Sequence, residues 1–83
     1  MSRDEIQDSV REYILEAFLP GVSASELTST TPLITGGILD SLGTIKLVAF
    51  LEQRYNVQLQ AREASVDHLD TIADISNLVA SKL

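Results

Sequence analysis

A spacing of three and four residues between apolar side chains constrains this fold most strongly, because it recurs in three segments and is typical of one face of an α-helix. The first segment carries it at Ile6, Val10, Tyr13, Ile14, Ala17 and Phe18. Ser2 and Glu5 form a capping-box pattern at its start. Met1 and Ile6 stand at the positions of a hydrophobic staple around that cap. We expect the helix to end at Leu19-Pro20-Gly21, since proline disfavours a helical conformation in the residue before it.

Two later segments repeat the helical spacing. The second starts at Asp40 and has two adjoining apolar stripes, one at Leu42, Ile45, Val48 and Ala49 and the other at Leu47, Leu51 and Tyr55. Asp40 is a suitable N-cap, and Asn56 can take the left-handed conformation that closes a helix. The apolar arc is wider than one buried face requires, so part of it is a candidate contact surface. The third segment starts at Asp70 or Thr71 and places its apolar residues at Ile72, Ile75, Val79 and Leu83.

The stretch from Pro20 to Leu39 is rich in Ser, Thr, Gly and Pro and connects the first two helices. A connection of this length is usually functional or disordered in a small domain. A solvated linker would not carry so many large apolar residues, which here are Leu27, Leu33, Ile34, Ile38 and Leu39. We therefore expect a loop pinned to the core, with a helical turn around Ser23 to Leu27. A further single turn is expected from Ala61 to Val66.

These elements predict an all-α fold, an irregular four-helix bundle of three main helices and one short helix with a long loop between the first two. The 83 residues are expected to form a single domain, 1–83, because domains of this size rarely divide further. We expect a monomer.

Composition excludes several classes of function. The chain has no cysteine, which rules out disulfides, zinc–thiolate sites and a thiol nucleophile. Its 12 acidic and 6 basic residues give a net charge of −6, which argues against binding nucleic acid or an anionic membrane surface. Neither a signal-peptide pattern nor an apolar run of about 20 residues is present, so a cytoplasmic location is expected.

Candidate catalytic groups are few. His68 is the single histidine, and a lone histidine before the last helix is most often a surface residue. The acids of the first helix have no histidine or cysteine nearby in sequence to complete a metal site. Gly36-Gly37 lacks the Lys-Ser/Thr of a Walker motif. We therefore expect a non-catalytic protein without a resident metal, and a small enzyme that uses His68 is the weakest alternative.

The segment from Gly36 to Leu42 permits two interpretations. Asp40 and Ser41 are residues that commonly do no more than start a helix. Alternatively, Ser41 is an attachment point for a phosphodiester, because a phosphate there lies at the positive end of the helix dipole beside free N–H groups. The Asp40 carboxylate would repel that phosphate, and it is suited instead to contacting a metal ion held by a modifying enzyme.

The sequence from Gly37 to Tyr55 resembles the acyl and peptidyl carrier proteins around their Asp-Ser-Leu modification motif, here Asp40-Ser41-Leu42. The position of the tripeptide, at the start of the second helix after a long loop in an acidic chain, makes the resemblance specific. It covers essentially the whole chain, from the acidic first helix to Leu69-Asp-Thr-Ile-Ala-Asp-Ile75.

The resemblance implies that Ser41 receives 4′-phosphopantetheine from coenzyme A through a phosphopantetheinyl transferase that uses magnesium. The thiol of this arm would carry an acyl or aminoacyl group as a thioester. A loading ligase or acyltransferase, and then downstream synthase or transferase enzymes, are the implied partners. By the same resemblance, partner enzymes would contact an exposed strip of α-helical residues, namely Leu42, Ile45, Lys46 and Ala49.

Departures from the pattern bear on the pathway. Carriers of bacterial fatty-acid synthesis usually have Gly-Ala before the aspartate and acids along the second helix. Here Ile38-Leu39 precedes Asp40, Gly43 follows the motif, and Lys46 stands where an acid is common. The net charge is −4 over residues 1–26 but zero over residues 40–56. These features favour a specialised carrier of an amino acid, a polyketide unit or a modified fatty acid. The alternative is an unmodified helical module that binds a partner through the strip from Leu42 to Ala49.

Overall fold

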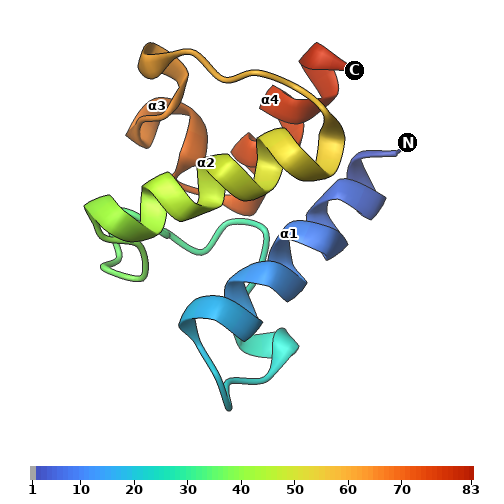
Figure 1. The fold of residues 1–83 in the computed structure, drawn as a ribbon. Coiled ribbons are helices and arrows are strands. Elements are labelled where there is room, and N and C mark those ends of the chain that lie inside the picture. Colours follow the sequence, from blue (N-terminus) through green and yellow to red (C-terminus); the bar gives the residue numbers. More distant parts are fainter. Residues whose placement is uncertain (1) are drawn as a thin grey trace.

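The computed structural model describes residues 2–83. Its main helices lie where the apolar spacing and the capping residues predict them. Four α-helices and two 3-10 turns follow one another, and no strand occurs in that range. Their bounds are α1 Arg3–Phe18, η1 Ala24–Glu26, α2 Ser41–Tyr55, η2 Ala61–Glu63, α3 Val66–Leu69 and α4 Ile72–Lys82. The expected all-α bundle of three main helices and one short helix is therefore confirmed (Figure 1).

The capping box of α1 forms as predicted. Ser2 Oγ accepts a hydrogen bond from the Glu5 N–H at 3.2 Å, and Glu5 Oε1 accepts one from the Ser2 N–H at 3.3 Å. The predicted staple involves Met1, which lies outside the described residues. One side of the helix is buried at Ile6, Val10 and Ile14. The prediction was wrong for Ala17, which is exposed, whereas the neighbouring Phe18 packs against the core.

The start and end of α2 also follow the sequence. Asp40 is its N-cap, with Oδ1 accepting a hydrogen bond from the Gly43 N–H at 2.6 Å. Asn56 ends the helix in the left-handed conformation at φ 53°. This residue pair fixes the length of the helix that begins at Ser41.

The segment predicted as one turn from Ala61 to Val66 is divided in the structure. Residues Ala61–Glu63 form η2, and Val66 instead begins α3. Ser65 interrupts the two with an extended backbone (φ −141°, ψ 172°). The break lets Leu69, at the end of α3, reach the core with no exposed surface. The sequence prediction was therefore wrong in its bounds.

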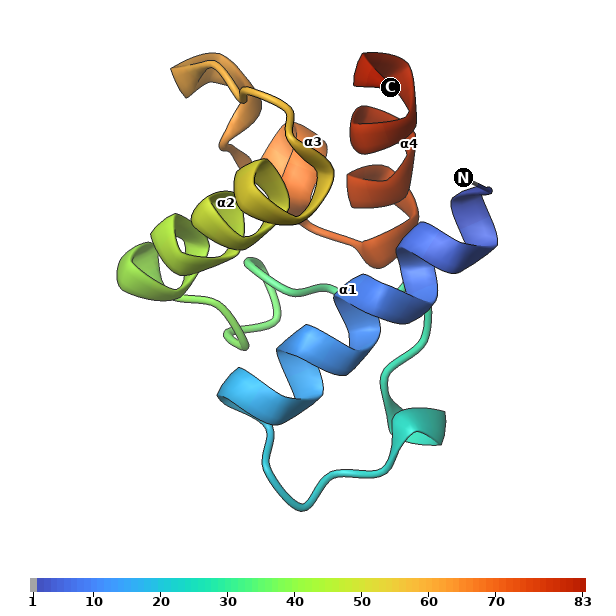
Figure 2. The same ribbon diagram turned by 45° about the vertical axis from the view of Figure 1, so that its right-hand side comes forward.

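Packing joins all four helices around one core. α1 and α3 both pack against α4, and Figure 2 shows α4 standing beside the first half of α1. α2 crosses this group and contributes its own buried side. The core consists of Ile6, Val10, Ile14, Leu27, Leu33, Leu39, Leu47, Leu51, Tyr55, Leu69, Ile72, Ile75, Leu78 and Val79.

The long connection between α1 and α2 is pinned to that core, as predicted. Leu27, Leu33 and Leu39 are no more than 2% exposed. The helical turn expected around Ser23 to Leu27 is η1. Backbone hydrogen bonds also tie the loop to α4, where the Ala73 N–H donates to the Ser29 carbonyl at 2.9 Å. The loop is therefore an integral layer of the domain.

The chain between α2 and α3 is held by carboxylates. Glu52 Oε2 accepts the Leu59 N–H at 3.0 Å, and Glu63 pairs with Lys82 of α4 at 2.9 Å. The Glu63 and Lys82 side chains are only 14% and 21% exposed. A hydrogen bond from the Gln60 N–H, then the Lys82 ammonium, lower the pKa of the Glu63 carboxyl below its usual 4.5.

We predict that core and surface positions of α2 respond differently to truncation. Leu47→Ala should lower the free energy of unfolding by about 2–5 kcal/mol, because Leu47 has no exposed surface. The total free energy of unfolding of a chain of this size is only about 3–5 kcal/mol, so a large fraction of the variant should be unfolded. Ile45→Ala, at a side chain that is 65% exposed, should leave stability nearly unchanged. Urea unfolding followed by circular dichroism measures both, and equal losses would contradict the assignment of faces.

A second prediction concerns pH. Because the pKa of Glu63 is lowered in the folded state, its stabilising contribution is present above 4.5 and is lost as pH falls through the folded value. Glu63→Gln should therefore be less stable than the wild type at neutral pH, and the difference should vanish in acid. Glu26→Gln, at an exposed carboxylate of η1 for which no hydrogen bond is found among residues 2–83, is the control and should show no difference at either pH. Thermal melts across the pH range measure the effect.

Candidate functional site

Ser41 is the first residue of α2 and is exposed to solvent. The turn before it requires glycine at two positions. Gly37 has a φ of +82°, and a Cβ on Gly36 would collide with the backbone carbonyl of Pro32. Leu39, two residues before Ser41, is almost fully buried. A tight, anchored turn therefore presents Ser41 at the surface.

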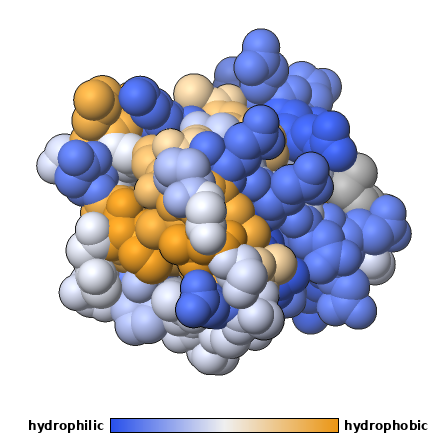
Figure 3. All heavy atoms as spheres, turned by 90° about the horizontal axis from the view of Figure 1, so that it is seen from below, coloured by the Kyte–Doolittle hydropathy of each residue, from blue (hydrophilic) through white to orange (hydrophobic). Residues whose placement is uncertain are grey.

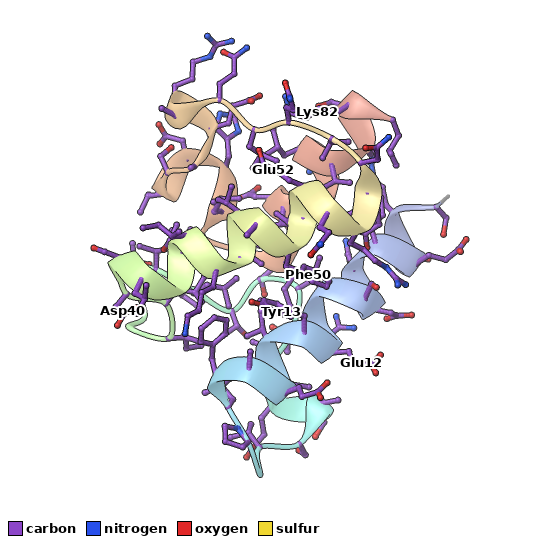
Figure 4. All side chains as sticks on the ribbon, viewed as in Figure 1. Glu12, Tyr13, Asp40, Phe50, Glu52 and Lys82 are labelled. Atoms are coloured by element: carbon purple, nitrogen blue, oxygen red, sulfur yellow. The ribbon has the colours of Figure 1, made fainter. Side chains whose placement is uncertain are left out.

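Asp40 organises the first turn of the helix. Besides the bond from its carboxylate to the Gly43 N–H, its carbonyl oxygen accepts the Thr44 N–H at 2.9 Å and the Thr44 hydroxyl at 2.8 Å. The N–H groups of Ser41 and Leu42 precede the helical ladder and have no acceptor in the part of the chain that the structure describes. Figure 4 shows Asp40 at the outer end of α2. This end of the helix is polar, open to solvent and electrostatically suited to an anionic substituent.

Gly43 is the residue after the Asp40-Ser41-Leu42 motif, where related carriers commonly have an acidic residue. It is buried, and a Cβ there would lie 3.2 Å from the Phe18 ring and 3.1 Å from Asp40 Oδ1. The end of α1 therefore packs closely on the first turn of α2. Farther along the same two helices, the rings of Tyr13 in α1 and Phe50 in α2 stack with their centroids 4.1 Å apart (Figure 4).

The strip predicted on α2 lies at the surface. Leu42 is 59% and Ile45 is 65% exposed, and Lys46 and Ala49 are exposed as well. Leu47, Leu51 and Tyr55 lie on the buried side, as expected from their spacing. Exposure of large apolar side chains on one helix face is typical of a contact surface. The role of the strip in binding partners stays a prediction.

An apolar groove beside Ser41 was not foreseen from the sequence. It has a volume of about 440 Å³ and lies between the first half of α2 and the chain from η2 to α3. Its lining is formed by Ile34, Ser41, Thr44, Ile45, Val48, Ala64, Ser65 and Val66. The one sequence signal for it was the excess width of the apolar arc on α2.

The loop that leads to Ser41 is fastened to the junction of α3 and α4 by Asp70. Its Oδ1 accepts the N–H groups of Ile34 and Thr35 at 2.8 and 2.9 Å, and its Oδ2 accepts the Thr35 hydroxyl at 2.9 Å. The Leu33 N–H donates to the Asp70 carbonyl at 2.6 Å. These bonds, led by that from the Thr35 N–H, lower the pKa of the Asp70 carboxyl below its usual 3.8.

His68 lies in α3 and is half-buried. Among residues 2–83, no three of the histidine and carboxylate side chains come together in a way that could hold a metal ion. No helix in that range is long and apolar enough to span a bilayer. The structure thus brings Asp40 and Ser41 together with the strip, and among residues 2–83 the His68 side chain makes no hydrogen bond or ion pair.

Polar character is divided between two sides of the molecule. In Figure 3, hydrophilic side chains cover the right-hand side, where α1 starts, and apolar side chains gather toward the side where α2 starts. The acids Asp4, Glu5 and Asp8 belong to the first part of α1. The surface around Ser41 is therefore less charged than the net charge of −6 suggests.

Comparison with known proteins identifies the family to which this chain belongs. The family model described as a phosphopantetheine attachment site matches residues 9–79. The D-alanyl carrier protein of Streptococcus pyogenes serotype M5 is 33% identical over 69 residues, which are 81% of this chain and 86% of that protein. The acyl carrier protein of Chlamydia caviae is 27% identical over 77 residues, 93% of this chain and 95% of that protein.

Among solved structures, that of KstB-PCP in its apo form superposes with a TM-score of 0.71 at 25% identity, covering 96% of this chain and 88% of that one. The match extends over nearly the whole bundle, including the long loop and α2. The chain therefore belongs to the phosphopantetheine-attachment family of carrier proteins, whose members bear that prosthetic group covalently.

Proposed function

We propose that Ser41 is the attachment residue for 4′-phosphopantetheine and that the protein carries an acyl or aminoacyl group to partner enzymes. The observation that carries the proposal is the exposed Ser41 hydroxyl at the N-terminus of α2, directly beside the apolar groove. When bound, the group supplies a terminal thiol that holds the cargo as a thioester. The chain has no cysteine of its own to compete for that cargo.

Two other serines of the helical region, Ser65 and Ser76, fit this role less well. Ser76 is fully buried and donates to the Ala73 carbonyl at 2.8 Å. Ser65 donates to the Arg62 carbonyl at 3.0 Å. The Ser41 hydroxyl makes no hydrogen bond within the described chain, and a phosphate on it would meet the free N–H groups of the first helical turn.

Asp40 has a double role in the proposal. One carboxylate oxygen caps α2 through Gly43 and so holds the first turn in shape. Since Asp40 is exposed, its carboxylate is also accessible to the magnesium ion that a phosphopantetheinyl transferase would bring.

The groove gives the arm or its cargo an apolar surface next to the attachment point. Its volume lies within the range of about 300–1,000 Å³ that is usual for small-ligand sites. The polar residues Thr44 and Ser65 are also among its lining residues, so we expect it to suit a chain with both apolar and amide groups. Such a groove would shield the cargo from water only in part, because it is open along the surface.

For the cargo we favour a specialised pathway and, within it, an amino acid. The Streptococcus relatives that are named D-alanyl carrier proteins reach 33% identity, against 27% for the acyl carrier protein of Chlamydia caviae. Lys46 and Gly43 replace acids on α2, so the contact surface is neutral and apolar. A loading ligase or acyltransferase and the later synthase or transferase enzymes would contact the strip of Leu42, Ile45, Lys46 and Ala49.

Modification of Ser41 is tested by mass spectrometry. Incubation with coenzyme A, magnesium and a broad-specificity phosphopantetheinyl transferase should add the mass of one phosphopantetheine to the wild type and none to Ser41→Ala. Ser25→Ala, at an exposed serine of η1, is the matched control and should be modified like the wild type. A gain of mass that survives Ser41→Ala would refute the assignment.

Charging of the modified protein tests the cargo. A D-alanine-adenylating ligase supplied with ATP and D-alanine should load the holo protein, and an acyl–acyl-carrier-protein synthetase supplied with a long-chain fatty acid should load it poorly. Preferential loading of the fatty acid would contradict the preference for an amino acid and leave the site at Ser41 unaffected.

The strip makes a prediction about affinity. Leu42→Asp should raise the KM of the transferase reaction by about 10- to 100-fold, since a buried leucine contributes about 1.5–3 kcal/mol. High salt should weaken wild-type binding only modestly, because the contact is mainly apolar. Ala17→Asp, on an exposed position of α1, is the control and should keep the wild-type KM. If Ser41→Ala kept the cellular function and Leu42→Asp removed it, the chain would be an unmodified interaction module.

A further inference from the structure

Asp70 makes a cluster of hydrogen bonds that the carrier chemistry itself does not require. It lies 29 positions after Ser41 in the sequence, at the end of α3 and just before Thr71, the N-cap of α4. Its carboxylate accepts the two backbone N–H groups of Ile34 and Thr35 and the Thr35 hydroxyl. A carboxylate that accepts three hydrogen bonds from a loop is a strong, directional anchor.

The loop held by Asp70 continues through hydrogen bonds of its own to Ser41. The Leu33 carbonyl accepts the N–H groups of Ile38 and Leu39, each at 2.9 Å. The Gly37 N–H donates to the Ile34 carbonyl at 3.1 Å. Residues 33–39 therefore form one hydrogen-bonded unit, which we call the presentation loop. Only Asp40 separates it from Ser41.

The presentation loop also contributes to the groove. Ile34 is one of its lining residues, together with Ala64, Ser65 and Val66 from the chain that leads through α3 to Asp70. The Asp70 carboxylate thus ties the segment that carries Ile34 to the end of α3. Burial of Leu33 and Leu69, both fully enclosed, places this junction on the core.

We propose that Asp70 is a positioning residue that holds the presentation loop, and through it Ser41 and the adjoining part of the groove, in the geometry that the modifying enzyme requires. The inference rests on the proposed function of Ser41. Asp70 does not touch the reacting atoms, so it acts only through the loop. Like any aspartate the carboxylate is charged at neutral pH, and the hydrogen bonds from the loop lower its pKa further below the usual 3.8.

The distinction between positioning and mere stability is measurable. The strip on α2 is untouched by changes at Asp70, so docking of the transferase should persist. A misplacement of the reacting hydroxyl by about 1 Å can lower a rate by about 100-fold. Asp70→Ala should therefore lower the kcat of transfer to Ser41 by about tenfold or more, with little change in KM.

Matched variants make the test specific. Asp70→Asn keeps an oxygen that can accept the Ile34 and Thr35 N–H groups, so it should restore most of the kcat. Thr35→Val removes only the hydroxyl bond and should give a smaller loss in the same direction. Asp67 is an exposed residue of α3 whose carboxylate makes no hydrogen bond within residues 2–83. Asp67→Ala should therefore behave like the wild type. If Asp70→Ala does not fold, Thr35→Val and Asp70→Asn decide the question.

A second measurement uses the protein before any modification. Amide hydrogen exchange by NMR should show faster exchange at Ile38 and Leu39 in Asp70→Ala and Thr35→Val, with the amides of α1 unchanged. A wild-type kcat in a folded Asp70→Ala, or a loss no greater than that of Asp67→Ala, would overturn the proposal. So would unchanged exchange in the loop. Absence of any transfer to the wild type would instead refute the proposed function of Ser41, and the exchange data would still judge the role of Asp70.

Discussion

The attachment of the long loop to the junction of α3 and α4 is the constraint on which the rest of the structure depends. Leu33 inserts into the core at full burial while its N–H donates to the Asp70 carbonyl. A loop of this length would otherwise carry a large entropic cost and leave backbone groups without partners. Once Leu33 is fixed, the turn through Gly36 and Gly37 follows, and α2 must begin where Ser41 stands. The conformation of this loop, although it has little regular secondary structure, is thus fixed by its contacts with the core and with Asp70.

α2 combines two tasks that place opposite demands on its surface. Leu47 and Leu51 are fully buried and hold the helix on the core. Leu42 and Ile45, one turn away, are more than half exposed and add nothing comparable to stability. Keeping large apolar side chains in water is unfavourable for solubility, so a function is the natural reason for them. One face of the helix is therefore held on the core while the other stays exposed, and such a fixed support would favour the proposed partner contact.

Much of the fold could be predicted because its signals are local. Helical spacing and caps identified α1, α2 and α4, and the motif at Ser41 lies within consecutive residues. The short elements were harder, since four residues show no period, and the turn expected from Ala61 to Val66 became η2 and part of α3. The groove and the Asp70 anchor could not be foreseen, because Ile34 and Val66, or Asp70 and Thr35, meet only after the chain has folded. Sequence patterns identify candidate residues, whereas contacts between distant segments depend on how those segments pack in the folded chain.

The distribution of charge links the fold to the choice of partner. Six of the twelve acids lie in residues 1–26, and the segment 40–56 is neutral overall. With a screening length of about 8 Å at physiological salt, acids at the far end of α1 add little to a contact at Ser41. A Cβ at Gly43 would make tight contacts of 3.2 Å with the Phe18 ring and 3.1 Å with Asp40 Oδ1, so a larger residue there would require these side chains to move. The packing between α1 and α2 thus favours a small, uncharged residue directly after the Asp40-Ser41-Leu42 motif. The proposed partners would therefore recognise this surface mainly by apolar shape, unlike enzymes that select their carrier by its negative charge.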